Sequence, residues 1–357
     1  MENYSILPAP YTVGPEAYRD IEKFCRIYGR KAVVIGGLKA MAAAREKLLA
    51  ATEGTGITIT DFIHYGTECT YEGADRLADM PAVQAADMVF AVGGGKAVDT
   101  CKLVCIKLQK PFMTFPTIAS NCAGSSALSI VYHEDHSFAA FVHLDAPAAH
   151  VFIDTQIIAA APREYLWAGI GDTYAKYYEV SISARGERLE HFKAMGVNLS
   201  RMCMETLVEH GTAALADNIA GKASYALEQA ALAIIITTGW VSMLVSKDHT
   251  MDYNGGLAHA FFYGLCNLPG FEETHLHGVT VGFGCLMLLT VDGRPEECEK
   301  LAAFNKTIGL PTRLSDMAVT VEDVARCAHA MTLDEDLEHY PYKVTEEMII
   351  EAAKKLA

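Results

Sequence analysis

Short apolar runs alternate with helix-forming stretches throughout the first 160 residues of this chain, and this alternation constrains the fold more than any other feature. The apolar runs are continuous, which is typical of strands that are covered on both faces of a parallel sheet. The predicted strands are residues 31–37, 56–66, 86–95, 111–117 and 149–155. The predicted helices between them are residues 38–51, 71–81 and 96–109. This order predicts an α/β fold with helices on both faces of the sheet.

The pattern changes twice along the chain. Residues 126–144 predict an antiparallel hairpin that turns at His133–His136, where polar residues cluster. After Pro162 no strand pattern is convincing, and the sequence instead predicts a series of helices. These are residues 163–184, 188–212, 214–221, 223–247, 254–264, 278–291, 295–307, 321–331 and 345–356. We therefore expect two domains, an α/β domain over residues 1–161 and an all-α domain over residues 162–357.

Composition narrows the range of partners. The chain has 357 residues, is 51% hydrophobic and carries a formal net charge of −15, so it is expected to be globular and a poor ligand for nucleic acid. Residues 230–245 resemble a membrane span, but they are shorter than the roughly 20 residues that a bilayer requires. We expect a buried helix there and no membrane partner. Ten cysteines without a CxxC pair, and no export signal at the first residues, predict free thiols and a cytoplasmic location.

Three consecutive glycines, Gly93–Gly95, end the third predicted strand, directly before its helix. Backbone amides at such a strand end can approach a phosphate closely, because glycine has no Cβ atom in the way. Lys96 opens the helix, and Asp99 is expected in the first turn, where the helix dipole favours a carboxylate. The stretch is neither a GxGxxG fingerprint nor a P-loop, and a tight turn between strand and helix explains it equally well. The small hydroxyl residues that follow the next strand could face the same ligand.

Five stretches of the sequence occur together in a recognisable order. They are "VGGGKAVDTCK", "FPTIAS…SALSIVY", "GIGDTYAKYYE", "LAHAFFYGL…HLHGVTVGFG" and "YPYKVTEEMIIEAAKKL". In these stretches the chain resembles the glycerol dehydrogenase branch of the iron-containing (group III) alcohol dehydrogenase family, whose architecture is shared with dehydroquinate synthase. The resemblance implies a Rossmann-like dinucleotide-binding domain, a helical domain that binds a metal and the substrate, and a homo-oligomer. It also implies hydride transfer between a nicotinamide cofactor and an alcohol carbon, with one divalent metal, Zn or Fe.

The resemblance also assigns residues by position. Asp172, His259 and His277 would be the metal ligands and so the catalytic residues. The cofactor would lie against two further sets, one at the pyrophosphate and one along the rest of its path. The pyrophosphate set is Gly94, Gly95 and Lys96, with Asp99 supporting the turn. The second set is Thr117, Ser120, Ser126, Leu128 and Tyr132.

The chemistry of the proposed ligands is consistent with this role, although each residue also has a simpler interpretation. Imidazole and carboxylate suit Zn²⁺ or Fe²⁺, and three protein ligands leave a position open for a substrate oxygen. Asp172 could instead cap the start of a helix, and His259 could be a hydrogen-bonded core histidine. His275 lies two residues before His277, so it is at most a neighbour that orients a ligand or relays a proton.

Two positions depart from the family pattern. Cys122 stands where glycerol dehydrogenases have an aspartate that holds the polyol. Because this negative charge is missing, we expect the pocket to accept a substrate carboxylate more readily. After the first strand, Gly37 stands where an NAD-preferring member often has an acid for the ribose, and Lys39 follows. This favours NADP slightly over NAD.

The resulting prediction is a metal-dependent NAD(P)-linked oxidoreductase with a small-molecule substrate. It would interconvert a secondary alcohol, either an α-hydroxy acid or a polyol, and its ketone or 2-oxo acid. The alternatives are a dehydroquinate synthase-like cyclase that uses NAD transiently, a glycerol dehydrogenase proper, and a catalytically silent dinucleotide-binding protein. A cyclase of that kind needs several basic residues around a phosphorylated substrate, and the motifs here contain few lysines and arginines.

Overall fold

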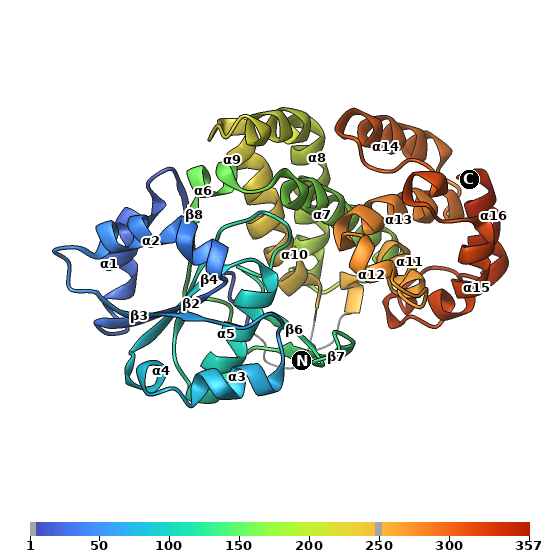
Figure 1. Ribbon diagram of the computed structural model, residues 1–357. Helices are drawn as coiled ribbons and strands as arrows, with labels where there is room; N and C mark the ends of the chain where they lie inside the picture. The colour runs from blue at the N-terminus through green and yellow to red at the C-terminus, as the bar shows by residue number, and fades with distance from the viewer. Residues whose placement is uncertain (1–4, 247–251) are drawn as a thin grey trace. The chain divides into compact units, whose positions relative to one another are not determined.

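The computed structural model describes residues 5–246 and 252–357, and these form two compact units (Figure 1). The N-terminal unit contains the chain up to Pro162 together with Ala216–Trp240, and the C-terminal unit contains Arg163–Leu215 and Val241–Ala357. Hydrogen bonds explain why 216–240 packs within the N-terminal unit. The Asn218 amide donates to three carbonyls between residues 158 and 161, and the Trp240 indole donates to Ala9 O. A domain boundary after residue 161 stays a prediction.

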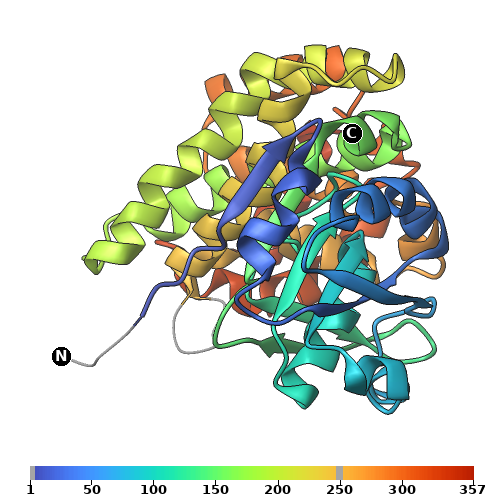
Figure 2. The same cartoon turned by 90° about the vertical axis from the view of Figure 1, so that its left-hand side faces the viewer.

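A six-stranded parallel sheet forms the centre of the N-terminal unit, in the order β1-β8-β5-β4-β2-β3. The strands are β1 (Tyr11–Gly14), β2 (Lys31–Gly36), β3 (Thr58–His64), β4 (Met88–Gly93), β5 (Phe112–Pro116) and β8 (His150–Asp154). The predicted parallel strands are confirmed. The edge strand β1, drawn in dark blue in Figure 2, was not predicted, because four residues are too few to show a pattern.

Burial explains why the central strands have continuous apolar sequences. Every residue of β4, β5 and β8 is buried, whereas the edge strand β3 is largely exposed. Phe115 stacks on Phe152 with ring centroids 5.1 Å apart and lies edge-on to Tyr18, which is also buried. The helical segments of this part are η1 (Ala17–Asp20), α1 (Ile21–Cys25), α2 (Leu38–Thr52), α3 (Tyr71–Ala78), α4 (Pro81–Ala85), α5 (Gly95–Leu108) and α6 (Thr155–Ala160).

The predicted hairpin is also confirmed. Strands β6 (Leu128–Tyr132) and β7 (Phe138–His143) pair antiparallel, and the His133 N–H donates to Ser137 O across the turn. His136 adopts a positive φ of 69° in this turn. The hairpin follows the polar loop after β5. The loop and the strand β6 together contain Thr117, Ser120, Ser126, Leu128 and Tyr132, which were predicted to line the cofactor path.

From Arg163 onward the described residues form helices and no strand, as predicted. The longer helices are α7 (Arg163–Ser183), α8 (His191–Ile219), α9 (Tyr225–Leu232), α10 (Thr238–Val245), α11 (Leu257–Leu265), α13 (His277–Val291), α14 (Pro295–Ile308), α15 (Val321–Thr332) and α16 (Glu346–Lys355). The short segments are the π-helix η2 (Ala233–Thr237), α12 (Phe271–Thr274), and the 3₁₀ turns η3 (Asp252–Asn254), η4 (Leu314–Met317) and η5 (Glu335–Leu337).

Two helix predictions need correction. The separate helices expected at 188–212 and 214–221 are one helix, α8, which continues through residue 213 without a break. The helix expected at 223–247 is α9, η2 and α10 in series, and its expected last residue, 247, lies outside the described residues. Residues 225–245 are long and apolar enough to cross a membrane, but their most apolar window is 67% buried, as expected for a core helix.

Candidate active site

Three side chains of the C-terminal unit meet at one point, although they come from three different helices. Asp172 lies on α7, His259 on α11 and His277 on α13. The Oδ1 atom of Asp172 is 3.5 Å from His259 Nε2 and 3.4 Å from His277 Nε2. One ligand atom from each residue lies within 4.8 Å of the other two. Bonds of about 2.0–2.2 Å from Zn²⁺ to nitrogen and oxygen require similar ligand separations. The structure therefore brings the predicted triad together as a candidate metal site.

Glycines at the crossing of α7 and α13 make this convergence possible. A Cβ atom on Gly171 would lie 2.2 Å from the Gly278 carbonyl oxygen, and one on Gly278 would lie 2.1 Å from the Ala168 carbonyl oxygen. Gly284 of α13 lies equally close to α11, because a Cβ atom on Gly284 would lie only 2.6 Å from the Ala258 carbonyl oxygen. The helix backbones are thus in direct contact. Aspartate has a short side chain, so Asp172 reaches the two histidines only because the helices approach this closely.

The structure corrects the helix-cap interpretation of Asp172 and the interpretation of His275 as a residue that orients a ligand. Asp172 stands in the middle of the 21-residue helix α7, so it does not cap a helix start. His275 does not join the cluster. Its ring stacks on Phe271, its Nδ1 lies 3.0 Å from Phe271 O, and its Nε2 lies 2.9 Å from Met317 O. Among the described residues, the hydrogen-bond partners of His275 are Thr274, Phe271 and Met317, and none of these belongs to the triad.

Glu179 is a site residue that the sequence interpretation missed. It lies on α7, is fully buried, and its Oε2 is 2.7 Å from His259 Nδ1. Its Oε1 accepts a hydrogen bond from the His259 backbone N–H at 2.9 Å. A signal for it exists in the sequence, because Asp172, Lys176 and Glu179 repeat at helical spacing within a largely apolar segment. Lys176 also belongs to this buried polar stripe, and its Nζ donates to Asn254 Oδ1 at 2.9 Å.

The electrostatics of the cluster fit a cation. Burial by itself lowers the pKa of His259, but the Glu179 and Asp172 carboxylates outweigh it and raise this pKa to about 10. Burial by itself raises the pKa of Asp172, but the two histidines hold it well below its usual range. In a neutral His259 with Nδ1–H donated to Glu179, the Nε2 lone pair faces the Asp172 carboxylate. The His259 Nε2 lone pair and the Asp172 Oδ1 atom both accept hydrogen bonds and lie 3.5 Å apart. A positive charge between them is therefore favourable, and either a proton or a divalent cation would supply it.

Asp336 is a further buried acid of the C-terminal unit. It is 6% exposed, and a Cβ atom on Gly255 would lie 2.1 Å from its carboxyl carbon. Burial, together with the neighbouring carboxylate of Asp334, raises the pKa of Asp336 to about 7. Because the folded-state pKa is raised, the folded protein holds a proton that the unfolded chain has lost. Stability is therefore expected to fall as the pH rises from about 4 to about 7.

Asp336→Asn removes this titration, so its stability relative to the wild type is expected to grow with pH. We expect the advantage to increase by about 3 kcal/mol between pH 5 and pH 8.5, with no further change above that. Urea unfolding at a series of pH values measures it. Glu338→Gln, at an exposed acid of the same segment, is the matched control. A difference between Asp336→Asn and wild type that is independent of pH would contradict the prediction.

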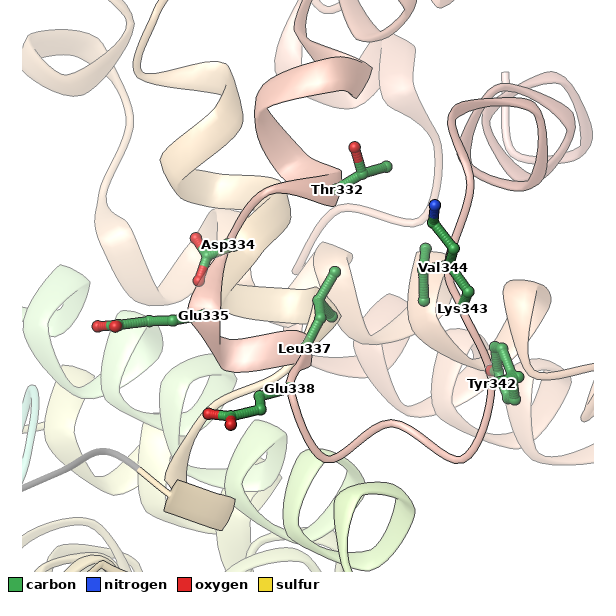
Figure 3. A pocket seen from close by; sticks show the side chains of 8 residues that line it. All are labelled: Thr332, Asp334, Glu335, Leu337, Glu338, Tyr342, Lys343 and Val344. Atoms are coloured by element: carbon green, nitrogen blue, oxygen red, sulfur yellow. The ribbon is translucent and has the colours of Figure 1, made fainter.

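A surface pocket over residues 332–344 is separate from the triad. It has a volume of about 350 Å³ and is drawn in Figure 3. It is lined by Thr332, Asp334, Glu335, Leu337, Glu338, Tyr342, Lys343 and Val344. None of the three triad residues lines it, so it is not the candidate active site.

The predicted cofactor residues gather at one edge of the sheet of the N-terminal unit. The strand order reverses between β2 and β4, because β3 lies on one side of this pair and β5 on the other. Open α/β sheets bind ligands at such a reversal. A Cβ atom on Gly93, whose φ is 149°, would lie 3.8 Å from the Gly37 nitrogen, so the turns after β2 and β4 meet there. Lys39, in the first turn of α2, is exposed.

The loop after β5 packs directly on the glycine turn. A Cβ atom on Gly94 would lie 2.6 Å from Ile118 Cδ1, and one on Gly95 would lie 2.8 Å from the Asn121 amide nitrogen. The Thr117 N–H donates to Gly93 O at 3.3 Å. Substituting either glycine would therefore push this loop outward. Ser120 and Cys122 are partly exposed on the same loop.

The two charged residues at this turn have partners of their own. Lys96 pairs with Glu68, a buried carboxylate, and its Nζ lies 5.4 Å from the centre of the Tyr132 ring. Asp99 was expected in the first turn of the helix, and this is wrong. Because α5 starts at Gly95, Asp99 falls in the second turn, where it is buried and pairs with Lys102 at 2.8 Å.

Asp99 and Lys102 hold the β6–β7 hairpin and the loop before it. Asp99 does not act by interacting with the dipole at the helix N-terminus, as was predicted. Asp99 Oδ2 accepts a hydrogen bond from the Ile130 N–H at 3.3 Å. The fully buried Lys102 ammonium donates to Ser126 Oγ at 3.3 Å and to Leu128 O. Ser126 and Leu128, two of the predicted cofactor residues, are thus held by the Lys102 side chain of α5.

Comparison with known proteins supports the predicted relationship to the iron-containing alcohol dehydrogenases. Residues 8–155 match the family model described as iron-containing alcohol dehydrogenase. The chain is 32% identical to glycerol dehydrogenase of Thermotoga maritima, over 98% of this chain and 95% of the relative. It is 29% identical to hydroxycarboxylate dehydrogenase A of Escherichia coli K12, over 98% and 96%.

Solved structures of glycerol dehydrogenases have the same fold. The fold matches the crystal structure of glycerol dehydrogenase from Schizosaccharomyces pombe with a TM-score of 0.87 and 24% identity, over 100% of this chain and 91% of the other. A probable glycerol dehydrogenase from Sinorhizobium meliloti 1021 matches with a TM-score of 0.84 and 25% identity, over 99% and 98%. From the parallel sheet, the helical region and these similarities, we conclude that the chain belongs to the iron-containing alcohol dehydrogenase family, in its glycerol dehydrogenase-like branch.

Proposed function

We propose that this protein is a metal-dependent NAD(P)-linked dehydrogenase that interconverts a small secondary alcohol and its ketone or 2-oxo acid. The observation that carries the proposal is the convergence of Asp172, His259 and His277, whose ligand atoms lie within 4.8 Å of one another. The three residues would hold one divalent cation, Zn²⁺ or Fe²⁺. When bound, such a cation lowers the pKa of an alcohol hydroxyl and polarises a carbonyl oxygen.

The residues of the chain have distinct tasks in this proposal. Glu179 holds the His259 ring through Nδ1, and the edge-to-face contact of Phe262 with His277, at 4.4 Å between centroids, restrains the second imidazole. In the N-terminal unit, the backbone N–H groups of Gly94 and Gly95, at the start of α5, would bind the pyrophosphate of the cofactor. Thr117, Ser120, Ser126, Leu128 and Tyr132 would line the rest of the cofactor path. The exposed Lys39 supports NADP as the preferred cofactor, since no acid precedes it in the turn after β2.

For the substrate, we propose an α-hydroxy acid rather than a polyol. Cys122 supports this, because a neutral thiol neither repels a carboxylate nor holds hydroxyl groups well. The similarity to hydroxycarboxylate dehydrogenase A supports it too. The test is a panel of 2-oxo acids, ketones and aldehydes, each with NADH and with NADPH, in the presence of Zn²⁺ or Fe²⁺. Turnover that disappears on chelation and returns with metal supports the proposal. A metal-free protein with the same turnover contradicts it.

Cys122→Asp is expected to shift the substrate preference from hydroxy acids towards polyols. A carboxylate at this position would repel the substrate carboxylate and accept hydrogen bonds from a polyol. We expect the ratio of kcat/KM for glycerol to that for a 2-hydroxy acid to rise by about 10- to 100-fold, equivalent to roughly 1.4–2.8 kcal/mol. Cys122→Ser, which adds no charge, is the control. An unchanged ratio in Cys122→Asp would reject the assignment of Cys122 to the substrate pocket.

A dehydroquinate synthase-like cyclase is the second candidate, since that class shares the metal and the cofactor. It would regenerate its nicotinamide in every cycle, whereas a dehydrogenase consumes NAD(P)H in proportion to substrate. The same substrate panel therefore separates the two. We also propose a cytoplasmic homo-oligomer. None of the ten cysteines, all of which lie within the described residues, forms a disulfide, which supports a reducing compartment.

A further inference from the structure

Glu179 has an unusual relation to His259, because both of its carboxylate oxygens accept hydrogen bonds from that one residue. Oε1 accepts from the backbone N–H at 2.9 Å, and Oε2 lies 2.7 Å from Nδ1 of the ring. The Glu179 side chain is 0% exposed, so water does not compete for these bonds. The His259 ring is thus tied to α7, the helix that also carries Asp172.

The carboxylate determines which ring nitrogen carries the proton. An ionised carboxylate only accepts hydrogen bonds, so Nδ1 must donate. In the neutral imidazole the other nitrogen, Nε2, then has its lone pair free. This nitrogen is the one that faces Asp172, at 3.5 Å from Oδ1. The orientation that Glu179 imposes is therefore the orientation that metal coordination through Nε2 requires.

The start of α11 is built to admit this carboxylate. Gly256, which precedes the first residue of the helix, leaves room for it, because a Cβ atom there would lie 2.9 Å from Glu179 Cγ and 3.0 Å from its Cβ. Tyr340 satisfies a second amide of the same turn, since the Leu257 N–H donates to its hydroxyl at 2.8 Å. Glu179 and Tyr340 therefore both cap α11, but of the two only Glu179 is hydrogen-bonded to the ring of His259.

We propose that Glu179 is a positioning residue that selects the Nδ1–H form of His259 and so prepares Nε2 for the metal. The inference rests on the metal site of the proposed function. It assigns to Glu179 no contact with substrate, cofactor or metal. Hydrogen-bond partners of metal-ligating histidines commonly contribute 10- to 100-fold to metal affinity.

Glu179→Gln tests this sharply, because glutamine has the same shape but only one acceptor oxygen. The backbone N–H of His259 always donates, so the glutamine oxygen would face it. The amide NH₂ would then face Nδ1, which would have to accept, and the ring proton would move to Nε2. Coordination through Nε2 would then require either loss of this hydrogen bond or two donors in contact. We expect the Zn²⁺ dissociation constant to rise by about 10- to 100-fold.

The experiment compares wild type, Glu179→Gln, Glu179→Asp and Tyr340→Phe. Competition with a chromogenic chelator measures Zn²⁺ affinity, and ¹H–¹⁵N spectra of the zinc-saturated proteins show which His259 nitrogen carries the proton. Tyr340→Phe removes the other cap of α11 and should keep the wild-type affinity and the Nδ1–H signal. Glu179→Asp retains a group that only accepts, so it should keep the Nδ1–H signal and bind Zn²⁺ more tightly than Glu179→Gln.

Two results would overturn the inference. One is a Glu179→Gln protein with wild-type zinc affinity and an intact Nδ1–H signal. The other is a wild-type spectrum with the proton on Nε2, which decides the question even if Glu179→Gln does not fold. Failure of the proposed function looks different, because wild type itself would then bind no Zn²⁺, or would bind it unchanged after His259→Ala.

Discussion

His259→Ala is expected to abolish turnover and to lower metal occupancy. The substitution removes one of three ligands, so Asp172 and His277 would be left to hold a divalent cation with two side chains. It also leaves the buried Glu179 carboxylate without the imidazole to which it is hydrogen-bonded. We expect kcat/KM to fall by on the order of 10³-fold or more, because the metal is the proposed electrophile of the reaction. Steady-state kinetics and metal analysis of the purified protein measure the two effects.

The matched control is His275→Ala, which removes an imidazole two residues from His277. His275 lies outside the triad, and its ring nitrogens are hydrogen-bonded to the carbonyl oxygens of Phe271 and Met317. We expect this variant to keep both its metal and its turnover. Full metal retention in His259→Ala would remove His259 from the set of ligands. Loss of metal in His275→Ala as well would show that the assay reports general instability.

Gly278→Ala is expected to destabilise the C-terminal unit and to disrupt the triad at the same time. The added methyl group would lie 2.1 Å from Ala168 O and 2.9 Å from Asp172 Cβ, so α7 and α13 must separate. Overpacking of this kind costs about 1–3 kcal/mol or more, because it meets backbone that cannot rotate away. Even a shift of about 1 Å would separate Asp172 from the imidazole nitrogens. We expect a lower midpoint of urea unfolding and a weaker Zn²⁺ affinity.

Gly211→Ala is the control for this prediction. Gly211 also lies inside a helix of the C-terminal unit, but an added methyl group there would approach no atom closer than the Phe304 ring, at 3.3 Å. Alanine also favours a helix by about 1 kcal/mol over glycine, so we expect this variant to be near wild type or more stable. If Gly278→Ala were as stable as Gly211→Ala, the close crossing of α7 and α13 would be wrong.

The pattern of the chain was sufficient for those parts of the fold that depend on local periodicity. Continuous apolar runs identified the inner strands, because each is buried on both faces. The same approach failed at β1, whose four residues carry no period, and at α8, which was predicted as two separate helices. It also gave no sign that Ala216–Trp240 packs with the N-terminal unit. Hydrogen bonds between distant residues determine that packing, as between Asn218 and Ile158.

At the candidate site, too, local sequence patterns were not sufficient, because its contacts join residues that are far apart in the chain. Asp172, His259 and His277 were selected by the resemblance, since local rules favoured a helix cap for the first and a core histidine for the second. Glu179 was missed, because its partner His259 lies 80 residues further along the chain. Asp99 was expected in the first turn of its helix but lies in the second, because α5 starts at Gly95, one residue earlier than predicted.

The sequence by itself determined the α/β character of the first part, the helices of the second, and the residue types available for metal and phosphate. These follow from side-chain periodicity and from chemistry that each residue carries wherever it lies. Only the tertiary structure decided that three helices cross at glycines closely enough for Asp172 to face two imidazoles. The distance between two helix backbones depends on which residues oppose each other, and residues far apart in the chain become opposed only when it folds.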